Sequence, residues 1–234
     1  GNNFGLERVQ TDCALILNPD IVCKNGFFKK IVKLIEKNKQ FSIVGCQYTN
    51  GRIYYPAGFF DKKKDKTFKK NFFKQKQKSL TKVDWVTGCS MLINLKKFDN
   101  KNIFDKNYFL YFEEFDLCKS TIKKGGLVYS SSDLKVYHLG FKGSFGADKK
   151  LINEASKLRN WHWMWSYFYF YKKNFNYLYA LYKILGKFLK SLVKIIFYTL
   201  IFNKSIRDKY LFRFLGLLSS VIGIKSNYRG SRFN

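Results

Sequence analysis

The hydrophobic pattern at the start of the chain predicts a strand that leads into a helix. A short apolar run at residues 13–17 stops at Asn18-Pro19-Asp20. This run predicts a buried strand, because proline ends the hydrogen-bond ladder. Residues 27–38 repeat apolar side chains at helical spacing. They predict a helix that buries one face.

The next segments alternate between strand-like and irregular patterns. Residues 41–48 lead into Asn50-Gly51, and a second strand-like run follows at 52–55. Asn-Gly between two such runs predicts a hairpin. Residues 61–82 are Lys-rich and poorly periodic, so they predict a surface loop.

Strand and helix alternate again farther along the chain. Strand character covers residues 84–94, a helix is predicted over 114–124, and short strands are predicted at 127–131 and 135–140. Such alternation indicates an α/β domain, which we place at residues 1–148.

The remaining residues, 149–234, predict a basic, aromatic-rich helical tail. One helix stripe consists of lysines that step by four, three and four: Lys183, Lys187, Lys190 and Lys194. An apolar helix with a lysine face suits the surface of a membrane. The uncharged run Ile195–Asn203 is far shorter than the ~20 residues that cross a bilayer. We therefore expect the helix to lie on a membrane; the alternative is a helix that packs its apolar face on the rest of the protein.

Composition narrows the class of protein. The chain is 46% hydrophobic and 19% aromatic, which excludes general disorder. Its formal charge is +28, but only seven of the 44 basic residues are Arg, so no nucleic-acid partner is expected. The charge favours anionic lipid headgroups or phosphorylated substrates, and a merely solvated surface is the alternative. Five scattered cysteines without a CxxC pair argue against zinc and disulfides, and fit a reducing cytoplasm.

Three carboxylates lie within an aromatic segment, Asn107–Ser120. They are Glu113, Glu114 and Asp116. Burying carboxylates together is costly unless a metal, a proton or a substrate hydroxyl compensates. Aromatic neighbours would raise the pKa of such a carboxyl, which suits a general base near neutral pH. The alternative is a helix N-terminus, where Glu113 and Glu114 only complement the helix dipole.

Other candidate residues lie at strand ends. Asp20 follows a buried strand, where α/β sheets bind ligands, and could hold a divalent metal; equally, Asn18-Pro19-Asp20 could be only a turn. His138 is either a metal ligand or a hydrogen-bonded core histidine. His162 lies between two tryptophans and is expected to be a packing or interfacial residue.

Four segments occur in the order LILNPDI, DWVTGCSMLI, FLYFEEFDLCKS and VYHLG. Together they resemble the bacterial glycosyltransferase family 2 proteins of the rhamnosyltransferase-like kind, over about residues 3–145. The tail segment RNWHWMWSYFYFYKK also resembles the C-terminal extension of that group. The resemblance implies a partial GT-A (nucleotide-diphospho-sugar transferase) fold and a hexosyltransferase. It also implies a nucleotide-sugar donor, a divalent metal (Mg²⁺ or Mn²⁺), and a cell-surface polysaccharide or lipid-linked acceptor.

The resemblance also suggests roles for residues at the donor. Asn18-Pro19-Asp20 would stand at the family's DxD position, with Asp20 reaching the metal and the diphosphate. Asn18 replaces the leading Asp, which leaves metal dependence open. His138 would match the late histidine that completes the metal site.

The acidic segment matches the family's Glu-Asp pair. Glu114 would be the base of an inverting transfer, although a Glu stands where the family has Asp, so the role could shift to Asp116. Asp84, Trp85 and Gly88 would line the donor and acceptor side of the cleft.

One departure from the family is large. The family's first βαβ unit has no counterpart, because the chain begins only about 17 residues before Asn18. We expect a fragment of a longer protein that is inactive alone and peripheral at the inner, cytoplasmic face of a bacterial cell membrane. The rival hypotheses are a non-enzymatic basic protein that binds membranes or nucleic acid, and a degenerate, inactive transferase.

Overall fold

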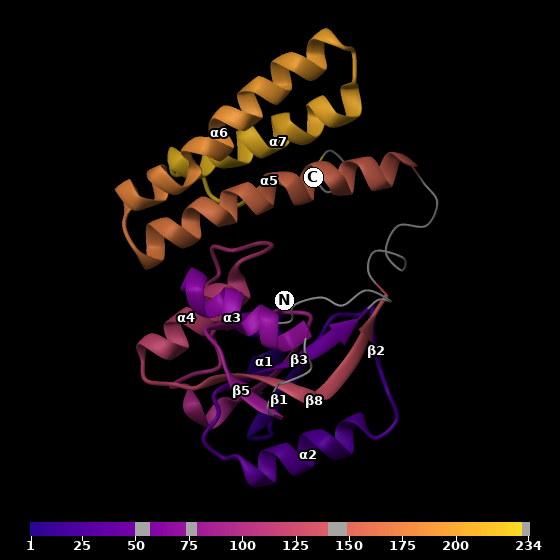
Figure 1. Ribbon diagram of the computed structural model, residues 1–234, viewed down its shortest axis with the longest axis vertical. Helices are drawn as coiled ribbons and strands as arrows, with labels where there is room; N and C mark the ends of the chain where they lie inside the picture. The colour runs from indigo at the N-terminus through magenta and orange to yellow at the C-terminus, as the bar shows by residue number, and fades with distance from the viewer. Residues whose placement is uncertain (50–56, 74–78, 140–148, 231–234) are drawn as a thin grey trace. The chain divides into compact units, whose positions relative to one another are not determined.

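The computed structural model describes residues 1–49, 57–73, 79–139 and 149–230 (Figure 1). It consists of two compact units, which are described separately. The α/β unit combines Gly1–Asp105 with Glu114–Ser144, and the helical unit combines Lys106–Glu113 with Phe145–Asn234. The predicted boundary between residues 148 and 149 stays a prediction, since eight residues from earlier in the chain cluster with the helices.

The α/β unit is built on a six-stranded sheet of order β1-β7-β3-β8-β2, with β5 also paired to β8. β3 and β8 are parallel, and the other pairs are antiparallel. The strands are β1 (Cys13–Leu17), β2 (Ile21–Cys23), β3 (Ile43–Thr49), β5 (Leu80–Lys82), β7 (Ser90–Asn94) and β8 (Val128–His138). A two-stranded sheet pairs β4 (Ala57–Gly58) with β6 (Trp85–Val86).

Helices accompany both faces of the six-stranded sheet. They are α1 (Asn2–Glu7), α2 (Phe27–Lys37), α3 (Lys62–Phe73), the short 3₁₀ helix η1 (Leu95–Lys97) and α4 (Glu113–Lys123). Every residue of β7 is buried, as expected for a central strand that is covered on both faces. The α/β class predicted from the sequence is confirmed at this level.

Side-chain alternation along β7 divides the core into two clusters. Ile93 belongs to one cluster with Leu117 of α4, whereas Leu92 belongs to the other with Phe27 and Ile31 of α2. Successive residues of a strand point to opposite faces. The sheet is therefore enclosed between α4 and α2, and the ends of its strands remain as the place where functional groups can gather.

Most predicted elements are found, with differences at their ends. The strand at 13–17, the helix at 27–38 and the helix at 114–124 are confirmed as β1, α2 and α4, and 84–94 is divided into β6 and β7. The two strands predicted at 127–131 and 135–140 form one strand, β8, with an irregularity in its pairing to β3. The predicted Asn50-Gly51 hairpin lies outside the described residues.

The prediction of a surface loop over residues 61–82 is wrong. The segment contains α3 and β5. The side chain of Asp61 accepts a hydrogen bond from the Lys64 amide at 2.8 Å, as at a helix start. Asp65 and Lys69 form an ion pair at 2.6 Å, and Phe68 is buried. One buried aromatic residue and local charge pairs therefore form a helix from a sequence with little periodicity.

The helical unit contains three helices in the described residues: α5 (Lys149–Asn174), α6 (Tyr177–Leu200) and α7 (Lys204–Val221). They run side by side in Figure 1, and α5 packs along both α6 and α7. The core of this unit includes Phe168, Ile184 and Leu217. A β-carbon at Gly216 would lie 2.1 Å from the carbonyl oxygen of Trp161, so glycine permits the close approach of α7 to α5.

Candidate active site

Three segments of the α/β unit meet at one end of the sheet. β1 and β7 pair antiparallel with Leu17 opposite Ser90, so the residues after β1 lie beside the residues before β7. The Asn18 amide donates a hydrogen bond to the Cys89 carbonyl oxygen at 3.0 Å. The sequence therefore folds so that the Asn18-Pro19-Asp20 segment adjoins the turn at Gly88 and Cys89.

Two of the predicted carboxylates lie near the thiol of Cys89. The pKa of its thiol is raised to about 11, first by burial, and the negative charges of Glu114 and Asp20 add to the rise. Charges act on a thiol in this way only over short distances within a protein. Asp20 at the end of β1 and Glu114 at the start of α4 thus share one neighbourhood.

Gly88 lies close to Glu114. A β-carbon at Gly88 would be 3.5 Å from the Glu114 β-carbon and 3.6 Å from its carboxyl carbon. The turn before β7 and the first turn of α4 are therefore close neighbours, with room for about one methyl group between Gly88 and Glu114. Glu114 also contributes to the raised pKa of the Cys118 thiol, about 12, for which burial is the main cause.

Asp20, directly before β2, and His138, the last residue of β8, form a pair. Their Oδ2 and Nε2 atoms are 3.1 Å apart, and both side chains are mostly buried. The pairing of β2 with β8 sets Ile21 opposite His138, and the Leu139 amide donates to the Asp20 carbonyl oxygen at 2.9 Å. The strand register therefore brings these two residues together, although they are far apart in the sequence.

The described residues contain no group of three or more His, Cys, Asp or Glu side chains arranged to hold a metal ion. Asp20 and His138 provide two ligand atoms of suitable type. Mg²⁺ in proteins is often held by one or two carboxylates together with waters and substrate phosphates. The pair fits such a shared site, but it does not form a metal site from protein ligands alone.

The three acidic residues of the predicted cluster occupy the first turns of α4. Asp116 is buried, and burial raises the pKa of Glu113 above that of an ordinary Glu. The Glu113 Oε2 atom is buried without a hydrogen-bond partner among the described residues. A carboxylate that only complemented a helix dipole would have a lowered pKa, so burial outweighs the dipole at Glu113.

The backbone before α4 is strained. Tyr111 and Phe112 both have φ of 67°, a left-handed conformation that bulky residues rarely adopt. Within the helical unit, Ser166 of α5 donates a hydrogen bond to the Leu110 carbonyl oxygen at 2.8 Å, and the Phe112 ring packs on Trp163 at 5.3 Å. Contacts with α5 therefore hold the strained residues immediately before Glu113.

Asp84 and Trp85 are placed by contacts with the β4 region. The Asp84 carboxylate accepts a hydrogen bond from the Phe60 amide at 2.9 Å, which gives Asp84 a structural role. The Trp85 ring packs at 4.8 Å on Phe115, the residue after Glu114. That these residues also bind the donor stays a prediction.

Sequence reasoning missed Cys89, whose thiol is influenced by the charges of both Asp20 and Glu114. The Thr87 hydroxyl lies 3.6 Å from the Cys89 sulfur, so the turn before β7 brings two polar side chains together. The position of Cys89 inside the DWVTGCSMLI segment was the available signal.

Comparison with known proteins finds a distant relative but does not assign the chain to a family. No family model matches the chain. Rhamnosyltransferase WbbL of Escherichia coli (strain K12) is 29% identical over 117 residues, which cover 46% of this chain and 44% of that protein. The chain thus spans less than half the length of this relative. The similarity indicates a distant relationship to a glycosyltransferase.

Proposed function

We propose that the chain is part of an inverting glycosyltransferase of family 2 with a GT-A fold. Its donor would be a nucleotide sugar, and its acceptor a cell-surface polysaccharide or a lipid-linked glycan. The distant relationship to a rhamnosyltransferase supports this class of reaction. The observation that carries the proposal is that the Asn18-Pro19-Asp20 segment is hydrogen-bonded to Cys89 while Gly88, the preceding residue, lies close to Glu114, because donor and base must lie together.

Glu114 is the proposed general base. In an inverting transfer, the base takes the proton from the acceptor hydroxyl as its oxygen attacks the anomeric carbon. The bond from that carbon to the diphosphate breaks with its electron pair on the leaving oxygen. The Glu114 side chain lies beside Gly88, in the turn before β7. Asp116 and Glu113 are the alternatives near the same helix start: Asp116 is buried, and so is the Oε2 atom of Glu113.

Asn18 and Asp20 are proposed to face the donor diphosphate, with Trp85 and Gly88 beside them. Asp20 and His138 would hold a divalent metal, Mg²⁺ or Mn²⁺, which would supply positive charge to the diphosphate. Their hydrogen-bond contact at 3.1 Å orients both side chains in advance. Such orientation is a common way for an enzyme to reduce the cost of binding a charged group.

The proposal is tested by replacing the candidate base with its neutral amide in the natural protein. Glu114→Gln keeps the size of the side chain but removes the base, so sugar transfer should fall by roughly 100-fold or more. The measurement is release of nucleoside diphosphate from a panel of nucleotide sugars. Glu36→Gln, an exposed carboxylate on α2, is the matched control and should retain full activity.

The result also separates the rival hypotheses. Unaltered transfer by Glu114→Gln would remove this residue from the mechanism, and Asp116→Asn would then be compared in the same assay. No transfer by the unmodified protein with any donor in the panel would favour a degenerate transferase. Retained lipid or nucleic-acid binding without any transfer would favour a non-enzymatic basic protein.

A further inference from the structure

α6 has two apolar faces, and only one of them is used for packing. Ala180, Ile184 and Ser191 are buried within the helical unit. Away from this face, a second stripe of apolar side chains is between 53% and 76% exposed: Leu178, Leu185, Leu189, Val193, Ile196 and Leu200. We call these six residues the outer stripe; their spacings of seven, four, four, three and four place them on one side of a helix.

The outer stripe continues into the turn after α6. Phe202 is 93% exposed and has φ of 54°, so the turn presents its ring to the surroundings. A helix on the surface of a soluble protein normally carries polar residues on its outer side. Contiguous exposed apolar patches mark interaction sites. Packing within the unit therefore explains the buried face of α6 but leaves the outer stripe without a role.

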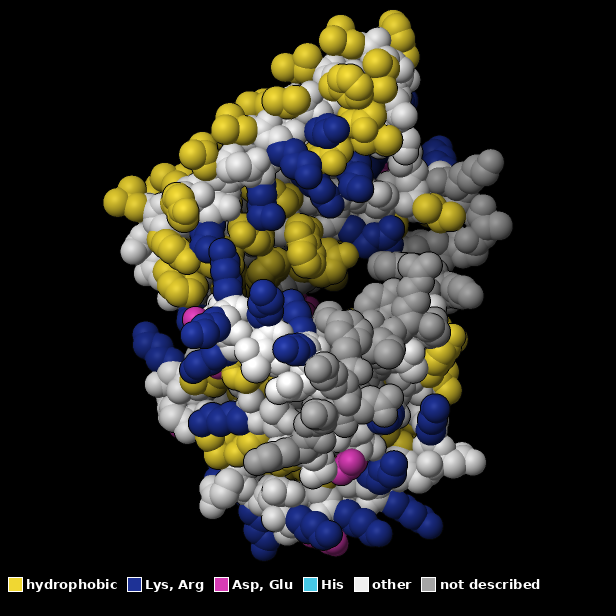
Figure 2. Space-filling view, viewed as in Figure 1, with side chains coloured by type: hydrophobic (Ala, Val, Ile, Leu, Met, Phe, Trp, Pro, Cys, Tyr) yellow, Lys and Arg dark blue, Asp and Glu magenta, His cyan; other side chains and the backbone are white. Residues whose placement is uncertain are grey.

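A row of lysines lies on another side of α6, between the outer stripe and the buried face. It consists of Lys183, Lys187, Lys190 and Lys194, and Figure 2 shows basic side chains next to the apolar edge of these helices. Lys183 lies over the Tyr179 ring at 5.2 Å, and Lys194 lies over the Tyr198 ring at 5.4 Å. The ammonium groups of these lysines therefore lie over tyrosine rings, and lysine and tyrosine side chains together are typical of the border between apolar and aqueous phases.

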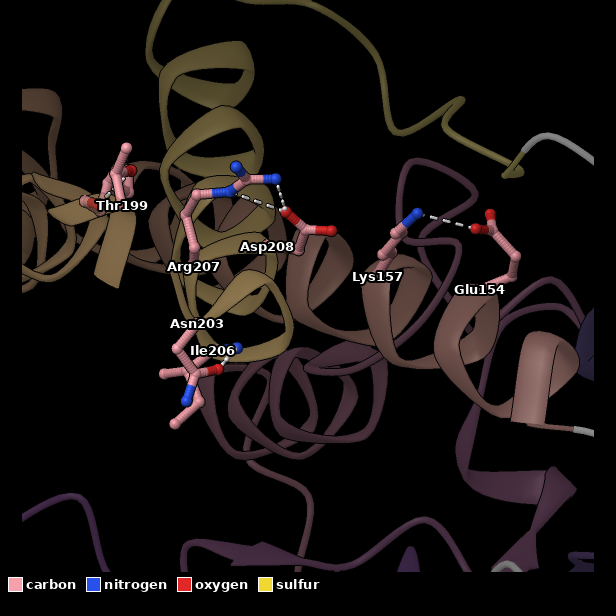
Figure 3. Close-up of polar contacts among 8 residues, drawn as sticks. Glu154, Lys157, Thr199, Asn203, Ile206, Arg207 and Asp208 are labelled. Atoms are coloured by element: carbon pink, nitrogen blue, oxygen red, sulfur yellow. Dashed lines mark hydrogen bonds and ion pairs between the residues drawn. The ribbon is translucent and has the colours of Figure 1, made fainter. Parts of the chain in front are cut away.

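These lysines have no acidic side chain on their own helix. α6 contains no Asp or Glu, and residues 151–234 contain only Glu154 and Asp208. Both of these are bound by other cations, as Figure 3 shows: Glu154 by Lys157 at 2.8 Å and Asp208 by Arg207 at 2.8 Å. The charge of the lysine row therefore calls for an anionic partner outside these helices.

We propose that α6 lies in the headgroup region of an anionic lipid leaflet. The outer stripe and Phe202 enter the acyl-chain boundary, and the lysine row contacts lipid phosphates. The 24-residue helix is about 36 Å long, so it presents an extended line of contact. None of the helices in the described part of the chain combines the length and apolarity needed to cross a bilayer, which agrees with a helix parallel to the surface.

A second copy of the chain is the competing occupant, and charge opposes it. Pairing two outer stripes would bring together two helices that each carry four lysines and no acidic side chain. Like charges at close range are destabilising, whereas anionic lipid neutralises both rows. The proposal concerns only this surface and does not depend on the transferase activity.

The test uses the 234-residue chain with vesicles of phosphatidylcholine, either alone or with 30% phosphatidylglycerol. We expect co-sedimentation with the anionic vesicles, weakening as salt rises. Replacing Lys183, Lys190 and Lys194 by Gln should reduce binding to anionic vesicles by about 100-fold, since each lysine near such a surface contributes about fivefold. Equal binding to both vesicle types would overturn the proposal.

A second variant tests the outer stripe itself. Leu189→Gln, Val193→Gln and Ile196→Gln together should reduce vesicle binding by about tenfold or more, with helix content unchanged because these side chains are exposed. Phe28→Gln with Val32→Gln is the matched control, since these residues are exposed apolar side chains on α2, and it should bind like the unmodified chain.

The same stripe variant distinguishes lipid from a second copy. Sedimentation velocity without vesicles should give the same oligomeric state for the unmodified chain and the variant. If the substitutions instead convert a dimer to a monomer and leave vesicle binding unchanged, the outer stripe is an interface between copies and the proposal is wrong.

Discussion

At the scale of single residues, the acidic cluster departs from what a helix start alone would produce. Glu113 lies where the helix dipole favours a charged carboxylate, yet burial raises its pKa. Its neighbour Glu114 lies close to Gly88 and influences the pKa of Cys89 and Cys118. Burial therefore outweighs the helix dipole at the first residue of α4.

His162 is a second titratable residue whose pKa is set by burial. It is fully buried; its Nδ1 lies 2.9 Å from the Ser226 hydroxyl and its Nε2 lies 2.7 Å from the Tyr228 carbonyl oxygen. Since a carbonyl oxygen only accepts, Nε2 carries the proton and Nδ1 accepts from Ser226. This confirms the expectation of a packing residue.

Acid should therefore destabilise the helical unit through His162. Burial lowers the pKa of His162 from 6.5 to about 4, so the unfolded chain binds more protons between these values. Stability is then complete above about pH 6.5 and is lost as the pH falls toward 4, by about 3 kcal/mol in total. Urea unfolding, followed by tryptophan fluorescence at pH 7 and pH 5, measures this loss.

His162→Gln keeps a side-chain donor but cannot titrate. The variant should be less stable than the unmodified chain at pH 7, with a smaller loss between pH 7 and pH 5. An identical loss in the two proteins would show that other groups cause the acid sensitivity.

At the scale of elements, two glycines on neighbouring helices have opposite surroundings. Gly216 of α7 abuts the Trp161 backbone, whereas a β-carbon at Gly186 of α6 would meet nothing within 4 Å. Gly216→Ala must separate α7 from α5 and should cost about 1–3 kcal/mol or more. Gly186→Ala adds a better helix former at an exposed site and should stabilise by up to ~1 kcal/mol.

Thermal unfolding of both variants provides the comparison. The melting temperature should fall for Gly216→Ala and rise slightly for Gly186→Ala. A small change of the same sign in both variants would mean that the close contact between α7 and α5 does not limit the stability of the helical unit.

Some helices and strands could be predicted from the sequence, and others could not. A continuous apolar run made β1 predictable and helical apolar spacing made α2 predictable, because both patterns reflect burial directly. α3 was missed because one buried aromatic residue, Phe68, leaves almost no periodic signal. Asp61 was nonetheless a signal for the start of α3, because its side chain accepts a hydrogen bond from the Lys64 amide. The strained φ values of Tyr111 and Phe112 had no signal at all, because contacts with distant residues of α5 hold them.

At the scale of the whole molecule, the order of the segments predicted an α/β domain and a helical tail. The convergence of Asp20 and Glu114 was expected only from the family resemblance. It depends on the antiparallel pairing of β1 with β7, which local patterns do not specify. Local patterns also did not predict that Lys106–Glu113 clusters with the helices while Glu114 belongs to the α/β unit. That division depends on contacts between residues that lie more than 50 positions apart, such as Leu110 and Ser166.

The two units should unfold in separate transitions, and the sequence supplies a probe for each. All five cysteines lie in the α/β unit, where Cys46, Cys89 and Cys118 are buried, whereas three of the four tryptophans lie on α5. Burial raises the pKa of Cys46 and Cys118 to about 12, so these thiols react only when the α/β unit opens. Each unit has its own buried core, which favours independent cooperativity.

Thiol labelling and tryptophan fluorescence along one urea series should therefore give different midpoints. Gly216→Ala is the decisive addition, because its effect is confined to the packing of α7 on α5. It should lower the fluorescence midpoint and leave the labelling midpoint in place. Coincident midpoints that move together in the variant would show a single cooperative unit, since two-state unfolding makes all probes agree. In that case the stability of the candidate active site would depend on the helical unit as well as on the α/β unit.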